Sequence, residues 1–170
     1  MAHGSFASIY ARYYDGVRRT LACLGVPAAA LDDAVQEVFV VVHRRGGLDE
    51  LPRAWIYGVA RRVAWRHHRS HGRSERRERE APVPDDGGSP EAALERDEAV
   101  AFMNAFLDAL DDDQRTVFVL AEIEELTARE VAAIVGASPN TVASRLRLAR
   151  GKFAAALARR EQDQGVRRGR

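Results

Sequence analysis

The sequence predicts an all-α protein with two small helical domains joined by a flexible linker. Apolar residues recur at helical spacing in both halves of the chain, and we find no internal repeat and no hairpin pattern. Between the halves, residues 71–90 are rich in Ser, Gly, Pro and charged side chains, and Val83 is their one large aliphatic residue. We therefore expect domains over residues 5–70 and 91–160, with the linker between them and a disordered tail over 161–170.

Three amphipathic helices are predicted in the first domain. Apolar residues share one face over residues 5–24, and Gly25 ends that helix. Over residues 32–43, helical spacing outweighs the strand propensity of a Val-rich run, and the two leading aspartates suit a helix N-terminus, where acidic side chains are favoured. A third helix starts after Pro52, a residue suited to the first turn, and runs to about Arg69.

A helix-turn-helix motif is predicted in the second domain, after two helices separated by three consecutive aspartates. Thr127 and Glu130 form a capping box, in which each side chain bonds to the backbone N–H of the other residue. Gly136 ends the short helix that follows, and Ser138 with Pro139 starts a second helix at once. Two helices joined by a tight turn containing glycine are typical of DNA-binding helix-turn-helix proteins.

The outer face of the second helix of the motif suits entry into the major groove of DNA. At roughly 100° per residue, Asn140, Ser144 and Arg147 face outwards, with Ala143 beside them. Arg can pair with guanine through two hydrogen bonds, and Asn can pair with adenine in the same way. Arg145 lies nearer the core and better suits a phosphate contact or an internal ion pair. The alternative interpretation is an ordinary helical hairpin with a solvated Arg face.

Charge is strongly segregated along the chain. Residues 1–80 hold 14 Arg against 9 Asp and Glu (+5), residues 81–125 hold 2 Arg against 13 (−11), and residues 126–170 hold 9 Arg and 1 Lys against 3 (+7). Two basic ends around an acidic middle indicate polyanion contacts at two places. The longest apolar run has six residues, far short of the ~20 needed to cross a bilayer. With Cys23 as the only cysteine and no secretory signal peptide, we expect a cytoplasmic protein without membrane insertion.

Neither an enzyme nor a cofactor-binding protein is expected. His67 and His71 are spaced for zinc, but no cysteine or carboxylate completes a site and the basic neighbours would repel a cation, so we expect no metal. The chain has no glycine-rich phosphate loop and no G-x-S-x-G motif. The run of aspartates at 111–113 is better explained by helix capping than by catalysis.

Several segments resemble bacterial RNA polymerase sigma factors. Residues 33–39, DAVQEVF, resemble the DxVQEVF segment in the second conserved region of that family, and residues 53–61, RAWIYGVAR, are similar to the WLYxIAR segment that follows it. Residues 112–150 resemble the fourth region, and no third region intervenes. In this order, the segments resemble the small extracytoplasmic-function (ECF) subgroup over nearly all of residues 5–160.

The resemblance implies a sigma factor that binds core RNA polymerase, recognises the −35 and −10 promoter elements and directs transcription initiation. The helix containing Asp33, Gln36, Glu37 and Phe39 would dock on the clamp helices of the largest polymerase subunit. The fourth region would bind the flap of the second-largest subunit. The resemblance also implies a monomer that an anti-sigma factor holds inactive by covering its polymerase-binding surfaces.

DNA contacts are implied for two sets of residues. The set expected at the −10 element is Trp55, Arg61, Arg62, Arg66 and Arg69. The set expected at the −35 element is Asn140, Thr141, Ala143, Ser144, Arg145 and Arg147. Trp55 suits either stacking on DNA or anchoring in the core. Arg62 and Arg66 replace polar residues of the family pattern, which favours phosphate attraction over base recognition.

A free-standing helix-turn-helix regulator that never joins polymerase is the alternative function. A helix-turn-helix regulator with a receiver domain should have alternating strands and helices in its amino-terminal half. The amino-terminal half of this sequence shows no such alternation. A dimeric repressor would need a helical seam, and no sustained heptad pattern is present. The molecular mass of the protein in solution distinguishes the sigma factor from the dimeric repressor. A sigma factor binds its promoter as one chain, whereas a repressor binds its operator as two.

Overall fold

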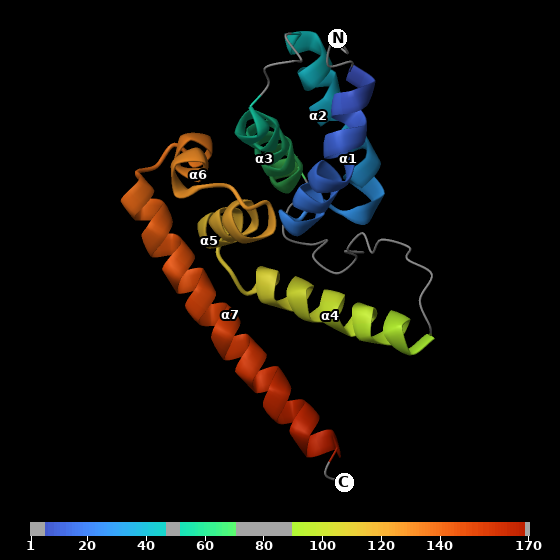
Figure 1. The fold of residues 1–170 in the computed structure, drawn as a ribbon, viewed down its shortest axis with the longest axis vertical. Coiled ribbons are helices and arrows are strands. Elements are labelled where there is room, and N and C mark those ends of the chain that lie inside the picture. Colours follow the sequence, from blue (N-terminus) through green and yellow to red (C-terminus); the bar gives the residue numbers. More distant parts are fainter. Residues whose placement is uncertain (1–5, 47–51, 71–89, 169–170) are drawn as a thin grey trace.

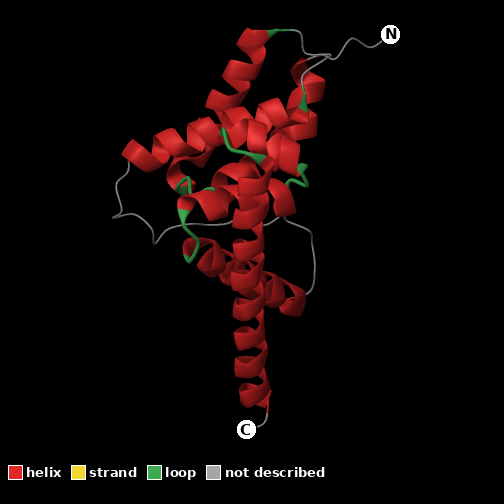
Figure 2. Cartoon of the chain, turned by 90° about the vertical axis from the view of Figure 1, so that its left-hand side faces the viewer, coloured by secondary structure: helices red, strands yellow, loops and turns green. Residues whose placement is uncertain are grey.

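The computed structural model describes residues 6–46, 52–70 and 90–168, and within these residues the secondary structure is helical throughout (Figures 1 and 2). The predicted all-α fold is therefore confirmed. The helices of the first half are α1 (Phe6–Cys23), α2 (Ala28–Arg45) and α3 (Arg53–Ser70). Those of the second half are α4 (Pro90–Asp108), α5 (Asp112–Phe118), the π-helical segment η3 (Val119–Ile123), α6 (Ala128–Val135) and α7 (Pro139–Arg168). The predicted linker over 71–90 lies almost entirely outside the described residues.

The first three helices pack against one another as a bundle (Figure 1). Each helix contributes fully buried side chains to its centre, among them Val17 and Leu21 of α1, Val38 of α2 and Ile56 of α3. The turn between α1 and α2 needs Gly25, which adopts a φ of 94° that other residues rarely adopt. The hydrophobic spacing that predicted amphipathic helices thus places their apolar faces in one shared core.

The second helix begins earlier than the sequence predicted. It starts at Ala28, directly after an extended Pro27, and its first turn contains no acidic residue. The two aspartates that were expected to open it, Asp32 and Asp33, are exposed residues farther along the helix. Alanine has the highest helix propensity, so the three alanines at 28–30 extend the helix back to the proline.

In the second half, the structure confirms the predicted cap and adds two features. The Asp111 carboxylate accepts a hydrogen bond of 2.8 Å from the Gln114 N–H and caps α5. The five residues that follow α5 form a π-helix, which the sequence did not predict. The last helix continues to Arg168 and projects beyond the rest of the protein (Figure 2), whereas a disordered tail was expected from residue 161. The Arg, Gln and Glu residues there are good helix formers.

The two halves contact each other directly. Helix α3 lies against α6, and α1 lies against η3. The buried residues Phe106, Leu107 and Val119 of the second half belong to the same continuous hydrophobic cluster as Val17 and Leu21 of the first. The cores of the two predicted domains are therefore joined in this structure.

Candidate nucleic-acid interface

The helix-turn-helix predicted from the sequence is present with its caps. Thr127 Oγ1 accepts a hydrogen bond from the Glu130 N–H at 3.3 Å, and the Glu130 carboxylate accepts one from the Thr127 N–H at 2.8 Å. Hydrogen bonds to the Glu130 carboxylate, first from the Thr127 hydroxyl and then from the Thr127 N–H, lower the pKa of Glu130. Gly136 ends α6 in the left-handed conformation, with a φ of 69°. Ser138 Oγ then accepts a hydrogen bond from the N–H of Thr141 at 3.1 Å, at the start of α7.

The predicted DNA-reading face of α7 points to solvent. Its buried side consists of Val142 and Ala149, which are both completely inaccessible. Five of the six residues expected at the −35 element are exposed: Asn140, Thr141, Ala143, Ser144 and Arg147. The outer face is thus accessible from solvent, as base contacts require, although the Thr141 hydroxyl already lies 2.9 Å from Ser138 Oγ.

Arg145 differs from the other residues predicted at this face. Its side chain is partly buried, and its Nη2 forms an ion pair with Asp113 Oδ2 at the start of α5. Of the two roles that the sequence left open for Arg145, the structure shows the internal ion pair. This pair joins α7 to α5 and holds the orientation of the helix that carries the exposed face.

The basic face of α3 is divided between solvent and the second half of the protein. Arg62 and Arg66 are exposed, and Arg66 forms an ion pair of 3.3 Å with Glu37 of α2. Arg61 is partly buried, and its Nη1 donates a weak hydrogen bond of 3.4 Å to the carbonyl of Ile134 in α6. Burial lowers the pKa of Arg61. The side chain of Arg69, also expected at the −10 element, lies outside the described residues.

The two tryptophans of α3 lie in opposite environments. Trp55 is half-buried against the core, and the Arg45 guanidinium lies 4.5 Å from its ring centroid. Trp65 is 58% exposed, on the same helix as the exposed arginines Arg62 and Arg66. Trp55 was predicted as a DNA contact and Trp65 was not, although helical geometry places Trp65 away from the buried Val59 and Val63.

The predicted polymerase-binding face of α2 is present in part. Asp33 and Gln36 are exposed, while Glu37 is half-buried beside Arg66. Phe39 is only 2% exposed, and its ring packs 4.6 Å from that of Tyr10. The core packing of Phe39 corrects the expectation of a direct polymerase contact for this residue. The helix also exposes an aliphatic pair that was not among the predicted contact residues, Val40 at 46% and Val41 at 37%.

The described residues hold no group of three or more His, Cys, Asp and Glu side chains placed to bind a metal. His71, one of the two histidines considered for zinc, lies outside these residues. Among the helices that can be described, none is both long enough and apolar enough to span a membrane.

A bundle with a basic helix, joined to a capped helix-turn-helix with an exposed polar face, is the architecture of a helical DNA-binding protein. Two family models match the chain: Sigma-70 region 2 over residues 9–74 and Sigma-70, region 4 over residues 103–153. The RNA polymerase sigma-H factor of Pseudomonas aeruginosa is 30% identical over 143 residues, which cover 76% of this chain and 74% of that protein. The chain belongs to the sigma-70 family of RNA polymerase sigma factors and is a sigma factor of the ECF type.

Further relatives agree with this assignment. The RNA polymerase sigma factor CnrH of Cupriavidus metallidurans is 28% identical over 165 residues, 90% of this chain and 86% of CnrH. The structure of CnrH in complex with the cytosolic domain of CnrY aligns with a TM-score of 0.66 and 26% identity, over 90% of this chain and 87% of that one. The sigma factor RpoE, solved with the anti-sigma factor NepR from Bartonella quintana, shares the fold, with a TM-score of 0.71 at 21% identity over 92% of this chain and 98% of that one.

Proposed function

We propose that this sigma factor joins core RNA polymerase in the cytoplasm through α2, contacts the −10 element through α3 and reads the −35 element through the beginning of α7. The observation that carries the proposal is the exposed face of α7, where Asn140, Ser144 and Arg147 project beyond a fully capped turn. Side chains of these types at the N-terminus of a recognition helix suit base contacts in the major groove.

Contact with the polymerase is assigned to the exposed side of α2. Gln36 and Asp33 supply polar groups there, and Val40 and Val41 supply apolar area. An exposed apolar pair beside polar groups is the usual composition of a protein-binding surface. Glu37 serves this surface less directly, because it is already paired with Arg66.

On the −10 side, Arg62 and Arg66 supply phosphate contacts, and Trp65 supplies a ring on which an unpaired base can stack. Neutralising phosphates contributes a large share of the affinity for DNA and makes it depend on salt. Stacking of a base on an aromatic side chain contributes about 1–3 kcal/mol. Trp65 therefore replaces Trp55 in the proposal, because the ring of Trp55 is turned towards the core and Arg45.

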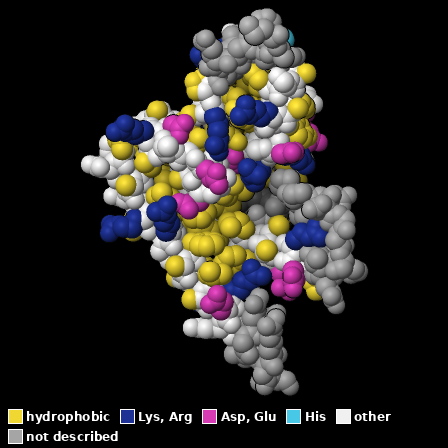
Figure 3. Space-filling model, viewed as in Figure 1, with side chains coloured by type: hydrophobic (Ala, Val, Ile, Leu, Met, Phe, Trp, Pro, Cys, Tyr) yellow, Lys and Arg dark blue, Asp and Glu magenta, His cyan; other side chains and the backbone are white. Residues whose placement is uncertain are grey.

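Control by an anti-sigma protein is a further part of the proposal. CnrH has been solved in complex with the cytosolic domain of another protein, CnrY, and the alignment covers 90% of this chain. In this protein, α4 and α7 border a groove of about 1240 Å³ lined by Phe102, Ala105 and Ala156, with Arg159 and Glu98 at its rim. Hydrophobic side chains gather across the middle of the face shown in Figure 3. A groove of this composition suits an amphipathic helix of the partner.

Transcription with purified components tests the proposal. Bacterial core polymerase without any sigma factor is mixed with the protein and sheared genomic DNA, and transcript starts are mapped. We expect discrete starts that require the protein and become at least fivefold weaker with Gln36→Ala. The matched control is Gln162→Ala, an exposed glutamine at the far end of α7. Tight DNA binding without core association or transcripts would instead favour the free-standing regulator.

A further inference from the structure

A pocket lined by arginines lies where α1, α3 and the turn after η3 meet. Its volume is about 620 Å³, within the range of about 300–1,000 Å³ that is usual for small-molecule sites. Arg12 and Arg19 line it from α1, and Arg53 lines it from α3. None of its lining residues belongs to the surfaces proposed for promoter DNA or core polymerase, so the proposed function gives this pocket no role.

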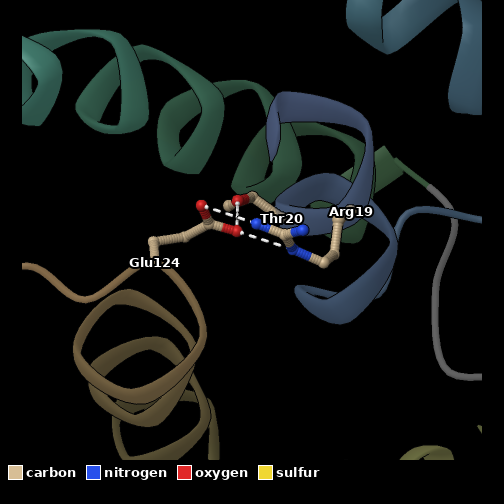
Figure 4. Close-up of polar contacts among 3 residues, drawn as sticks. All are labelled: Arg19, Thr20 and Glu124. Atoms are coloured by element: carbon tan, nitrogen blue, oxygen red, sulfur yellow. Dashed lines mark hydrogen bonds and ion pairs between the residues drawn. The ribbon is translucent and has the colours of Figure 1, made fainter. Parts of the chain in front are cut away.

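Arg19 is held in place by a buried carboxylate. Glu124 follows η3 and is only 1% exposed, and its two oxygens accept hydrogen bonds of 3.2 Å from Nε and Nη2 of Arg19 (Figure 4). Glu124 Oε1 also accepts a hydrogen bond of 2.9 Å from Thr20 Oγ1. The Arg19 side chain remains 49% exposed, and a guanidinium group has more N–H donors than these two bonds use. Glu124 therefore orients Arg19 and leaves it donors for a ligand.

Gly16 shapes the pocket between the two arginines of α1. Arg12, Gly16 and Arg19 are spaced by four and three residues, which places them on one face of the helix. A Cβ atom on Gly16 would lie 2.5 Å from the Tyr57 hydroxyl oxygen, so glycine makes room for Tyr57 beside the arginines. Burial, followed by a hydrogen bond to Glu124 and its charge, raises the pKa of Tyr57. The hydroxyl therefore stays neutral and does not repel an anion.

Arg12 and Arg53 bring positive charge that the protein leaves without an acidic partner. Both are exposed, and their guanidinium carbons lie 5.6 Å from the ring centroids of Tyr13 and Tyr57, respectively. Within the part of the chain that the structure describes, neither arginine forms an ion pair with an acidic side chain. Contact with an aromatic ring limits the movement of a guanidinium group and so prepares it for binding.

Two glutamates at the pocket oppose an anion only in part. Glu124 is already bonded to Arg19, and Glu125 is exposed, where solvent and salt weaken the effect of its charge. Three arginines against two glutamates leave the lining with a net formal charge of +1. The electrostatic balance of the pocket therefore favours an anionic ligand.

The spacing of the arginines suits a ligand with more than one phosphate group. Guanidinium groups bind phosphate oxygens through paired, charge-assisted hydrogen bonds. Arg12 and Arg19 are seven residues apart on α1, which separates their backbones by about 10 Å along the helix axis. The half-buried ring of Tyr13, also in the lining, offers an aromatic surface to the ring of a nucleobase.

We propose that this pocket binds a small ligand of the nucleoside diphosphate class, with Arg12, Arg19 and Arg53 as the phosphate-binding residues. Isothermal titration calorimetry with the full-length protein tests the site without polymerase or DNA. The probes are guanosine 5′-diphosphate, inorganic tripolyphosphate, which lacks a base, and guanosine, which lacks phosphate. We expect the diphosphate and tripolyphosphate to bind and guanosine alone not to bind, because the arginines recognise phosphate.

Variants of the exposed arginines locate the binding. Arg12→Gln and Arg53→Gln should each weaken the binding of guanosine 5′-diphosphate by about fivefold or more, because each removes a charge-assisted contact. The matched control is Arg44→Gln, which removes the same charge from an exposed position in the last turn of α2, outside the pocket. It should change the affinity by less than about twofold, since exposed charges at a distance are screened by salt. Circular dichroism verifies that each variant is folded.

Three results would overturn this site. The first is no binding of either phosphate probe at millimolar concentration, and the second is an equal loss of affinity in Arg12→Gln and Arg44→Gln. The third is tighter binding of single-stranded oligothymidylate that is lost in Arg12→Gln and Arg53→Gln, which would assign the pocket to promoter DNA. All of these are distinct from a failure to start transcripts, because nucleotide binding is measured in the absence of polymerase and promoter.

Discussion

Arg145 and Arg147 show how neighbouring residues of one type acquire different roles. They are two positions apart on α7, which rotates Arg145 towards Asp113 and leaves Arg147 in solvent. This difference in orientation can be predicted from helical geometry, which placed Arg145 nearer the core and allowed it either an internal ion pair or a phosphate contact. The partner, Asp113, could not be inferred, because it lies on another helix whose orientation depends on the whole domain.

Arg147→Ala should weaken binding to the −35 element by about 1–3 kcal/mol and relax the sequence preference at one base pair, because a paired guanine would lose its two hydrogen bonds. Fluorescence anisotropy with a labelled promoter duplex and single-base variants measures both effects. Arg159→Ala is the control, since Arg159 is exposed farther along the same helix and bonds to the carbonyl of Ala155. Equal losses from both variants would indicate a nonspecific charge effect.

Cys23 should react slowly with thiol reagents in the folded protein. Burial raises the pKa of its thiol from 9.0 to about 11, and the thiolate is the reactive form. The alkylation rate should therefore rise about tenfold per pH unit from pH 8 to 10 in the folded state, while in urea it should level off above pH 9. A folded-state rate that is level by pH 9 would contradict the assigned environment.

The same pKa difference affects stability. Below the unfolded-state pKa, both states carry a neutral thiol, and its contribution to stability is fully present. As the pH rises towards the folded-state pKa, the unfolded state releases its proton first, so the contribution is lost. Cys23→Ser removes this dependence and serves as the control.

At the scale of helices, two glycines respond oppositely to the same substitution. Gly58→Ala places a methyl group at ordinary contact distance from Ile134, 3.7 Å from its Cγ1, and replaces glycine inside a helix. We expect the free energy of unfolding to rise by about 0.5–1 kcal/mol. Gly16→Ala should instead lower it, because its Cβ would lie 2.5 Å from the Tyr57 hydroxyl oxygen. Urea unfolding measures both variants, and a loss of stability in Gly58→Ala would show that α3 and α6 are packed more tightly than described.

The helices themselves follow closely from local chemistry. Thr127, Glu130, Gly136 and Ser138 mark the limits of α6 and the start of α7, because capping depends on residues within one turn. The predicted start of α2 was wrong by several residues, because the two aspartates suited a helix N-terminus and the alanines before them were not included in the helix. The π-helix η3 was missed because its sequence, VLAEI, has no feature that separates it from an α-helix.

At the scale of the whole molecule, the joined cores should unfold together. Both tryptophans lie on α3, so their fluorescence reports the first half of the protein, whereas far-ultraviolet circular dichroism reports all helices. We expect the two urea transitions to coincide in the wild-type protein, as required of a cooperative unit. Arg19→Gln should separate them by weakening the contact with Glu124. Distinct midpoints in the wild-type protein would show that the halves are energetically independent.

The contact between the halves is the part of the structure that no local pattern predicts. Glu124 lies in an acidic stretch, and such a stretch is ordinarily expected to be exposed to solvent. Its partner Arg19 is separated from it by 105 positions in the sequence. Trp65 was overlooked for a related reason, since exposure depends on which side of α3 the neighbouring helices cover. Such pairings come from the packing of distant segments.

The helical fold, the division into two halves, the helix-turn-helix with its caps and the family of the chain could all be inferred from the amino-acid sequence. Hydrophobic spacing and capping act within a few residues, so they can be recognised in one dimension. The burial of Phe39 in the core, the ion pair of Arg145 with Asp113 and the hydrogen bonds of Glu124 to Arg19 in the other half became visible in the folded structure. Burial and ion pairing depend on what lies opposite a side chain, and that is established when the chain is folded.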